Sequence, residues 1–231
     1  MFQYDAAILE RFPQTVGGVI IAKGMSNGAS NEALLQAYQD EQQAVIERIG
    51  DTALSDLPTL SAWRSTFSAF GVNPTKTRSA PEALLRRLTK KGDIPSINTL
   101  VDIGNLVSIR YGLPVAVFDI RSLIGTLTVR FAGGDERYTA PGSNEIKHPD
   151  EGEVIFADET GLVFARRWCW RQSFQSAAKI DTTNAIIVVE AQHDRGYADI
   201  EKAQSDLLAL LKQYAGGEFE STMLTVDKAR F

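Results

Sequence analysis

The order of hydrophobic and polar positions predicts mostly helices in the first half of the chain. Leu34, Tyr38 and Val45 recur at helical spacing after Asn31, a residue type that often caps a helix, and together they predict a helix over 31–49. The same spacing rule predicts further helices over 61–71, 81–88, 98–105 and 197–215.

Short apolar runs bounded by Gly, Pro and Asn predict strands, most of them in the second half. They cover 12–22, 115–118, 127–131, 138–139, 153–157, 161–167 and 185–190. Helices and strands do not alternate regularly, so the pattern favours an α+β fold over a doubly wound α/β fold. No stretch reads as a linker, and we expect one domain over 1–231.

The charge and the amino-acid composition limit the kinds of partner and the compartment that we expect for this protein. The net charge is −5, with 24 basic and 29 acidic residues, whereas proteins that bind long duplexes usually carry a basic surplus. Any nucleic-acid contact should therefore be local, and DNA is not expected as a partner. No apolar run is long enough to span a membrane, and the first residues do not resemble a signal peptide. The single cysteine, Cys169, fits a reducing cytoplasm.

The common catalytic and cofactor motifs are absent. Gly17-Gly18 lacks the helix, lysine and serine that would make a phosphate-binding loop. His148 and His193 stand in no metal-ligand spacing, and no serine lies in a nucleophile-elbow context. We therefore expect no cofactor and no metal. If the protein is an enzyme, it should position a substrate and a water.

Three polar residues stand out in the central segment 95–130. Asn98, Asp102 and Asn105 are spaced by four and three residues, which places them on one face of the predicted helix. Polar groups on a largely apolar helix need partners. Two interpretations stay open: they bind a ligand, or Asn98 caps the helix and Asp102 holds a neighbouring loop.

Cations and aromatic residues form two further candidate sites. Lys76 and Arg78 lie on a loop bent by Pro74, ahead of the pair Arg86-Arg87, and suit a phosphate or a carboxylate. The alternative is a solvated basic surface.

In 166–171 arginines and tryptophans interleave. As a strand, this segment would place Trp168 and Trp170 on one face and Arg167, Cys169 and Arg171 on the other, with Arg171 as an anion partner. Segment 181–184 adds hydroxyls before the last predicted strand, or simply forms a turn.

Several motifs in series resemble a known family. They are P-S-I-N-T-L-V-D-I-G-N-L-V-S, G-L-P-V-A-V-F-D-I, G-T-L-T-V-R, E-V-I-F-A-D-E and D-T-T-N-A-I-I-V-V-E, over about 80–190. This order is similar to the editing and tRNA-binding module of the bacterial phenylalanyl-tRNA synthetase beta subunit. Segment 63–79 is similar to free-standing versions of the module.

The resemblance implies a β-sandwich-like core of mixed sheets with flanking helices. The family-like core would span about 60–195, with an N-terminal strand and helix and a C-terminal helix packed on it. The implied activity is hydrolysis, in trans, of the ester of a mischarged aminoacyl-tRNA whose 3′ end enters a pocket. A catalytically silent module that binds RNA or an amino acid is the alternative.

Side-chain chemistry then suggests roles in such a reaction. Asn98, Asn105 and Thr183 would be catalytic, with Thr182 beside them; Asp102 or Asp119 would bind the substrate ammonium; Arg78 or Arg171 would bind a terminal phosphate, with Lys76 as a further substrate-binding cation. Two positions depart from the family. Ala116 stands where synthetase members carry a histidine, and Gln172 or Gln175 stands in the region where they carry a glutamate that contacts the tyrosine hydroxyl.

Overall fold

The computed structural model describes residues 1–231. Its helices are α1 Ala6–Arg11, α2 Glu32–Ile49, α3 Pro58–Ala69, α4 Ala80–Lys91, α5 Thr99–Tyr111 and α6 Gly196–Tyr214, with a 3₁₀ turn η1 Leu54–Asp56. Its strands are β1 Phe2–Tyr4, β2 Val16–Lys23, β3 Val115–Asp119, β4 Leu127–Phe131, β5 Tyr138–Thr139, β6 Ile146–Lys147, β7 Val154–Ala157, β8 Val163–Arg166, β9 Arg171–Gln172, β10 Ala185–Ala191 and β11 Glu218–Leu224. None of the helices is both long and apolar enough to cross a membrane.

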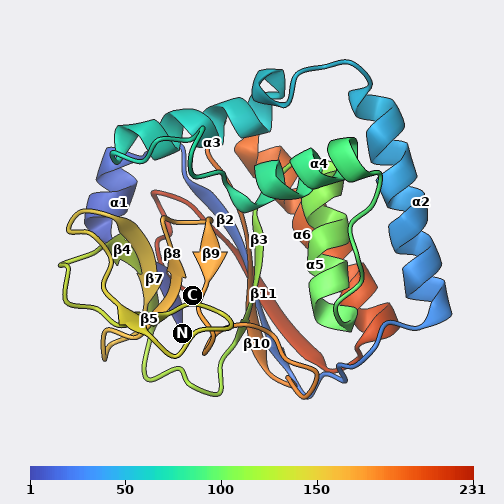
Figure 1. The fold of residues 1–231 in the computed structure, drawn as a ribbon. Helices are drawn as coiled ribbons and strands as arrows, with labels where there is room; N and C mark the ends of the chain where they lie inside the picture. Colours follow the sequence, from blue (N-terminus) through green and yellow to red (C-terminus); the bar gives the residue numbers. More distant parts are fainter.

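The strands form two main sheets that pack against each other (Figure 1). One has four strands in the order β11-β2-β10-β3, all antiparallel. The other has five in the order β1-β4-β7-β8-β9, in which only β1 and β4 run parallel. Helices α2, α5 and α6 cover the outer face of the four-stranded sheet, on the right of Figure 1. The fold is α+β with two packed sheets and flanking helices, as predicted.

Strand β10 explains this layering, because it is buried on both faces. Side chains alternate along a strand, so Ile187 and Val189 pack into the core under the helices, while Ile186 and Val188 pack into the core between the sheets. All seven residues of β10 are buried, including Glu190. Glu190 has the same parity as Ile186 and Val188, which turns its side chain toward the space between the sheets.

Local signals set the ends of the helices. The Asn31 side chain accepts a hydrogen bond from the Leu34 amide and begins α2. The Asn98 side chain begins α5 in the same way, through the Val101 amide. Gly112, at φ 66°, ends α5 in the left-handed region that glycine adopts without strain, and it sends the chain into β3.

Most predicted elements are present, with ends shifted by a few residues. The missed elements are β1, α1, η1, β6 and β11. Strand β11 is largely polar and lies at a sheet edge, where it pairs with β2, so its sequence carries no burial pattern. Backbone hydrogen bonds join Phe2 to Phe231, and the two ends of the chain lie side by side in Figure 1.

Candidate functional site

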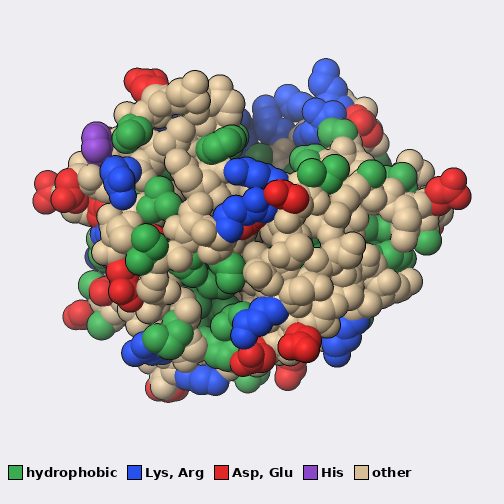
Figure 2. All heavy atoms as spheres, turned by 90° about the horizontal axis from the view of Figure 1, so that it is seen from below, with side chains coloured by type: hydrophobic (Ala, Val, Ile, Leu, Met, Phe, Trp, Pro, Cys, Tyr) green, Lys and Arg blue, Asp and Glu red, His purple; other side chains and the backbone are tan.

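A cavity of about 450 Å³ opens where the two sheets and α4 meet. Its walls are mostly apolar and come from α4, α5, β3, β7, β8, β9, β10 and the turn before β9. The lining residues are Ala80, Ala83, Leu84, Arg87, Asn105, Pro114, Val115, Ala116, Phe118, Pro141, Phe156, Ala165, Trp168, Cys169, Trp170, Arg171, Gln172, Ala177 and Glu190. Figure 2 shows a hollow in the upper middle of its face, between the two halves of the molecule, with basic side chains beside it.

Glu190 is the acidic group of this cavity. Its side chain is buried, and one oxygen, Oε1, accepts hydrogen bonds from the Tyr4 hydroxyl at 2.8 Å and the Trp168 indole at 2.9 Å. The other oxygen, Oε2, has no protein donor. Burial raises the pKa of Glu190 to about 7, although the bonds from Trp168 and Tyr4 oppose this rise. The cavity therefore presents one half-satisfied carboxyl group among apolar walls.

The segment between β8 and β9 is a turn. The predicted strand over 161–167 is present as β8, but its continuation as a strand through 167–170 is wrong. Arg167 and Trp168 have φ values of 47° and 58°, in the left-handed region that strands do not use. The turn is held because the Arg167 amide donates to Glu153 and the Trp168 amide to Val154. Consequently Trp168 is buried in the cavity wall instead of sharing a strand face with Trp170.

A buried ion pair involving Arg166, the residue directly before this turn, supports it. Arg166 donates to both carboxylate oxygens of Glu153, at 2.9 and 2.6 Å, and both residues are buried. Beyond the turn, the guanidinium carbons of Arg167 and Arg171 lie 4.7 and 4.9 Å from the centre of the Trp170 ring. The mouth of the cavity thus carries stacked cationic and aromatic groups, of which Arg171 is exposed and makes no ion pair.

Four residues predicted for the site line this cavity together. Asn105 comes from α5, Ala116 from β3, and Arg171 and Gln172 form β9. The Gln172 side chain donates to the Val117 carbonyl at 3.0 Å, which ties β9 to β3 across the cavity. Ala116 leaves the wall here small and apolar.

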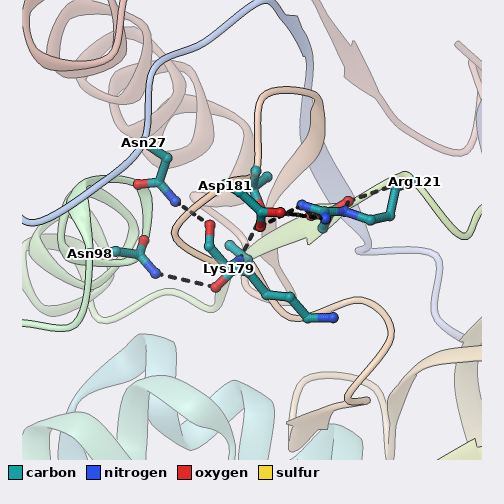
Figure 3. Close-up of polar contacts among 8 residues, drawn as sticks. Asn27, Asn98, Arg121, Lys179 and Asp181 are labelled. Carbon is teal, nitrogen blue, oxygen red and sulfur yellow. Dashed lines mark hydrogen bonds and ion pairs between the residues drawn. The ribbon is translucent and has the colours of Figure 1, made fainter.

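Asn98 and Asp102 lie outside the cavity and hold loops in place. Besides capping α5, Asn98 donates to the Ala178 carbonyl at 3.2 Å, and Figure 3 shows Asn27 reaching Lys179 of the same loop. Asp102 is fully buried and accepts hydrogen bonds from Ser30, Ser96 and the Ile97 amide. Asn98, Asp102 and Asn105 therefore do not form the predicted common polar face. Asn98 caps α5, Asp102 holds loops, and only Asn105 lines the cavity.

Asp119 and Thr183 line a second, polar hollow of about 480 Å³ beyond the end of β3, and Thr182 is buried behind Asp119. Buried Asp119 accepts from the Thr182 hydroxyl at 2.5 Å and from Arg121, which also pairs with Asp181 (Figure 3). Burial alone would raise the pKa of Asp119, but the bonds from Arg121 and Thr182 outweigh it and hold the pKa below its usual value. Thr183 is exposed.

The remaining predicted residues are also away from the main cavity. Lys76 is exposed on the loop after α3, and Arg78 lies 3.8 Å from the Glu82 carboxylate at the start of α4. Gln175 donates weakly to the Thr139 hydroxyl at 3.4 Å, and its carbonyl oxygen is buried without a partner. No three His, Cys, Asp or Glu side chains converge as a metal site would require.

We expect Asn98→Ala to destabilise the fold. The variant loses the cap on Val101 and the bond to the 178 carbonyl, so the free energy of unfolding should fall by about 1–2 kcal/mol in urea titrations. Asn105→Ala, on the same helix, is the control, because Asn105 neither caps α5 nor bonds to a neighbouring loop carbonyl. Its stability should change by no more than about 0.5 kcal/mol. Equal losses in the two variants would contradict the capping role.

Sequence comparison places the chain in a family. A family model described as the B3/4 domain matches residues 62–216. The chain belongs to the B3/4 domain family. Curated relatives of this B3/4 chain are phenylalanine–tRNA ligase beta subunits. That of Shewanella oneidensis is 30% identical over 94 residues (41% of this chain, 12% of that protein), and that of Vibrio cholerae is 27% identical over 155 residues (67% and 19%). This chain thus spans less than a fifth of the length of these relatives.

A solved structure is also similar to this B3/4 chain. It is an N-terminal fragment of the phenylalanyl-tRNA synthetase beta subunit from Pyrococcus horikoshii, with a TM-score of 0.48 and 12% identity. The match covers 96% of this chain and 53% of that one.

Sequence reasoning missed Glu190 as a residue of the site. The signal was present: in A-I-I-V-V-E-A a charged residue ends an otherwise apolar strand, at a position whose side chain must face a core. A carboxylate at such a position is costly unless it is paired or serves a ligand.

Proposed function

We propose that the main cavity receives the aminoacylated 3′ end of a tRNA and that the protein hydrolyses the ester of a mischarged aminoacyl-tRNA in trans. One observation carries the proposal: a 450 Å³ cavity with aromatic walls and one buried carboxyl group, in a B3/4 domain. The relatives' names connect this domain to tRNA aminoacylation, although the chain covers only a small part of each of them.

The cavity favours an aromatic amino acid that bears a hydroxyl group. Phe118, Phe156 and Trp168 give flat apolar contact, and Glu190 Oε2 offers an acceptor among them. A phenol hydroxyl would donate to this oxygen. A side chain without a donor would leave Oε2 buried and without a partner, and such a mismatch discriminates strongly between otherwise similar substrates.

The mouth of the cavity suits the nucleotide end of the substrate. Arg171 is exposed and stacked on Trp170, so its guanidinium can pair with a phosphate while its plane offers a surface to the terminal base. Arg87, from α4, lies at the same cavity. The net negative charge of the chain fits contact with one end of an RNA better than with a long duplex.

The chemistry we propose is attack of an ordered water on the ester. The water oxygen bonds to the carbonyl carbon, the bond from that carbon to the ribose oxygen breaks, and the ribose oxygen takes up the proton that the water loses. The amides of Asn105 and Gln172 are placed to orient the water or the carbonyl. Cys169 does not suit a nucleophile, because burial raises the pKa of its thiol well above the usual value.

The second candidate function is a non-catalytic module that binds RNA or an amino acid. Ala116 favours it, because the wall has an alanine where synthetase members of the family carry a histidine. Catalytic roles for Asn98 and Thr183, and binding roles for Lys76, Asp102, Asp119, Gln175 and Thr182, stay predictions. We further propose that residues 1–231 act as one domain and that the reaction takes place in the cytoplasm.

The test is release of amino acid from a panel of mischarged tRNAs. We expect faster release of tyrosine than of phenylalanine from the same tRNA, because only tyrosine has a donor for Glu190. Measurements with protein in excess, as single turnovers, separate chemistry from product release. Binding of these tRNAs without release of any amino acid would support the second function. Neither binding nor release would reject both hydrolysis and RNA binding.

A further inference from the structure

Positive charge is concentrated in one part of this acidic protein. Segment 58–93, from α3 to the end of α4, holds seven Lys or Arg residues and only two Asp or Glu residues, a net charge of +5. The whole chain has a net charge of −5, so the remaining residues sum to −10. Such an asymmetry gives this surface a local potential that the overall charge hides.

Part of this charge converges on a hollow of about 380 Å³ between α3, α4 and η1. Four cations line it: Arg64, Arg78, Arg86 and Lys90. The lining also includes hydroxyl groups, those of Ser55, Thr75 and Thr89. We call this the basic pocket.

Glu82, the one acidic residue of the basic pocket, organises two of the cations. It is buried, and its Oε1 lies 2.7 Å from Arg64 and 3.8 Å from Arg78. One carboxylate cannot neutralise four cations, so the pocket keeps a positive excess. Arg86 and Lys90 are exposed and have no ion-pair partner on the protein. Their charges are free for a ligand.

Helix α4 connects the basic pocket to the main cavity. Ala80, Ala83 and Arg87 line the cavity, whereas Glu82, Arg86 and Lys90 line the basic pocket. These two sets follow the spacing of three and four residues that defines one helix face each. A helix with its side chains is about 10 Å across, so a strand that enters the cavity can also reach the basic pocket over α4.

We propose that the basic pocket binds a backbone phosphate of the RNA strand whose end enters the main cavity. The inference rests on the proposed function. Guanidinium groups match phosphate oxygens in fork geometry, and hydroxyls complete such sites. The continuity of α4 between the two sites favours a nucleic-acid strand over an acidic protein. A single strand, unlike a folded partner, can occupy both sites at once.

The test uses the full chain and the double variant Arg86→Gln/Lys90→Gln. Neither side chain lines the cavity or makes an ion pair, so the fold should be kept, as thermal melting will check. We expect affinity for uncharged tRNA to fall about tenfold, and the slope of log affinity against log salt to shrink by about two. The control is Lys202→Gln/Lys212→Gln, which removes two exposed charges from α6.

A short substrate separates this inference from the proposed function. Hydrolysis of an amino acid esterified to adenosine, which is too short to cross α4, should be unchanged in Arg86→Gln/Lys90→Gln. If tRNA is bound and hydrolysed equally well by this variant and the parent, the inference fails and the proposed function stands. An equal loss of tRNA affinity in Arg86→Gln/Lys90→Gln and in Lys202→Gln/Lys212→Gln would also overturn the inference, since any exposed charge would then contribute as much as the basic pocket. An acidic peptide that displaces tRNA only from the parent would point to a protein ligand and reject the phosphate assignment.

Discussion

Ala116→Trp is expected to lower the rate of aminoacyl-tRNA hydrolysis at least about 100-fold. Ala116 lies on the wall of the main cavity, on β3, and an indole there would occupy the space proposed for the amino acid side chain. A substrate held even about 1 Å out of place can lose this much rate. The measurement is single-turnover release of tyrosine from mischarged tRNA.

The control for this variant is Ala7→Trp, which adds the same side chain at an exposed position of α1. It should hydrolyse the substrate at the parent rate. Ala83→Trp gives a second obstruction from the exposed face of α4, in case overpacking at Ala116 impairs folding. Parent-like rates in folded Ala116→Trp and Ala83→Trp would show that the reaction does not use this cavity.

Glu190→Gln is expected to change how stability depends on pH. Burial raises the pKa of Glu190 to about 7 in the folded protein, against 4.5 for an ordinary glutamate. Between these two pH values the folded state binds the proton and the unfolded chain does not. The free energy of unfolding must therefore fall as pH rises through this window, and it stays lower above pH 7. Two and a half pKa units correspond to about 3 kcal/mol.

Glutamine cannot ionise, so the variant should lack this contribution. Its oxygen can still accept from Tyr4 and Trp168, which keeps the local contacts. We expect the stability difference, variant minus parent, to become more positive by about 3 kcal/mol between pH 4 and pH 8, measured by urea denaturation. Subtracting the parent removes the contributions of the other titrating groups. A difference that does not vary with pH would show that Glu190 titrates normally.

The effect of Glu190 on stability and its proposed effect on substrate preference have a common cause. An ionised carboxylate in an apolar wall costs folding free energy, and it is kept where a ligand uses it. Glu190→Gln should accordingly be more stable at pH 8 and also poorer at distinguishing tyrosine from phenylalanine. A variant that gained stability and kept the preference would assign the preference to the aromatic walls instead.

The sequence by itself determined most elements and the fold class. Periodic apolar residues marked α2, α5 and α6, and the run A-I-I-V-V-E-A marked the central strand β10, because buried faces impose their spacing on the chain. Asn31 was recognisable as a cap because its side chain accepts a hydrogen bond from an amide only three residues away. The serial motifs gave the family, and the matching family model covers 62–216.

Only the tertiary structure decided which polar residues share a site. Asn98, Asp102 and Asn105 look equivalent along the helix, yet the first caps it, the second holds two loops, and the third reaches the cavity. Glu190, Trp168 and Ala116 come from segments far apart in the chain and line one cavity, where the Trp168 indole donates to Glu190. Helical spacing is a local property, whereas a cavity forms where distant segments pack, and no short stretch of sequence encodes that meeting point.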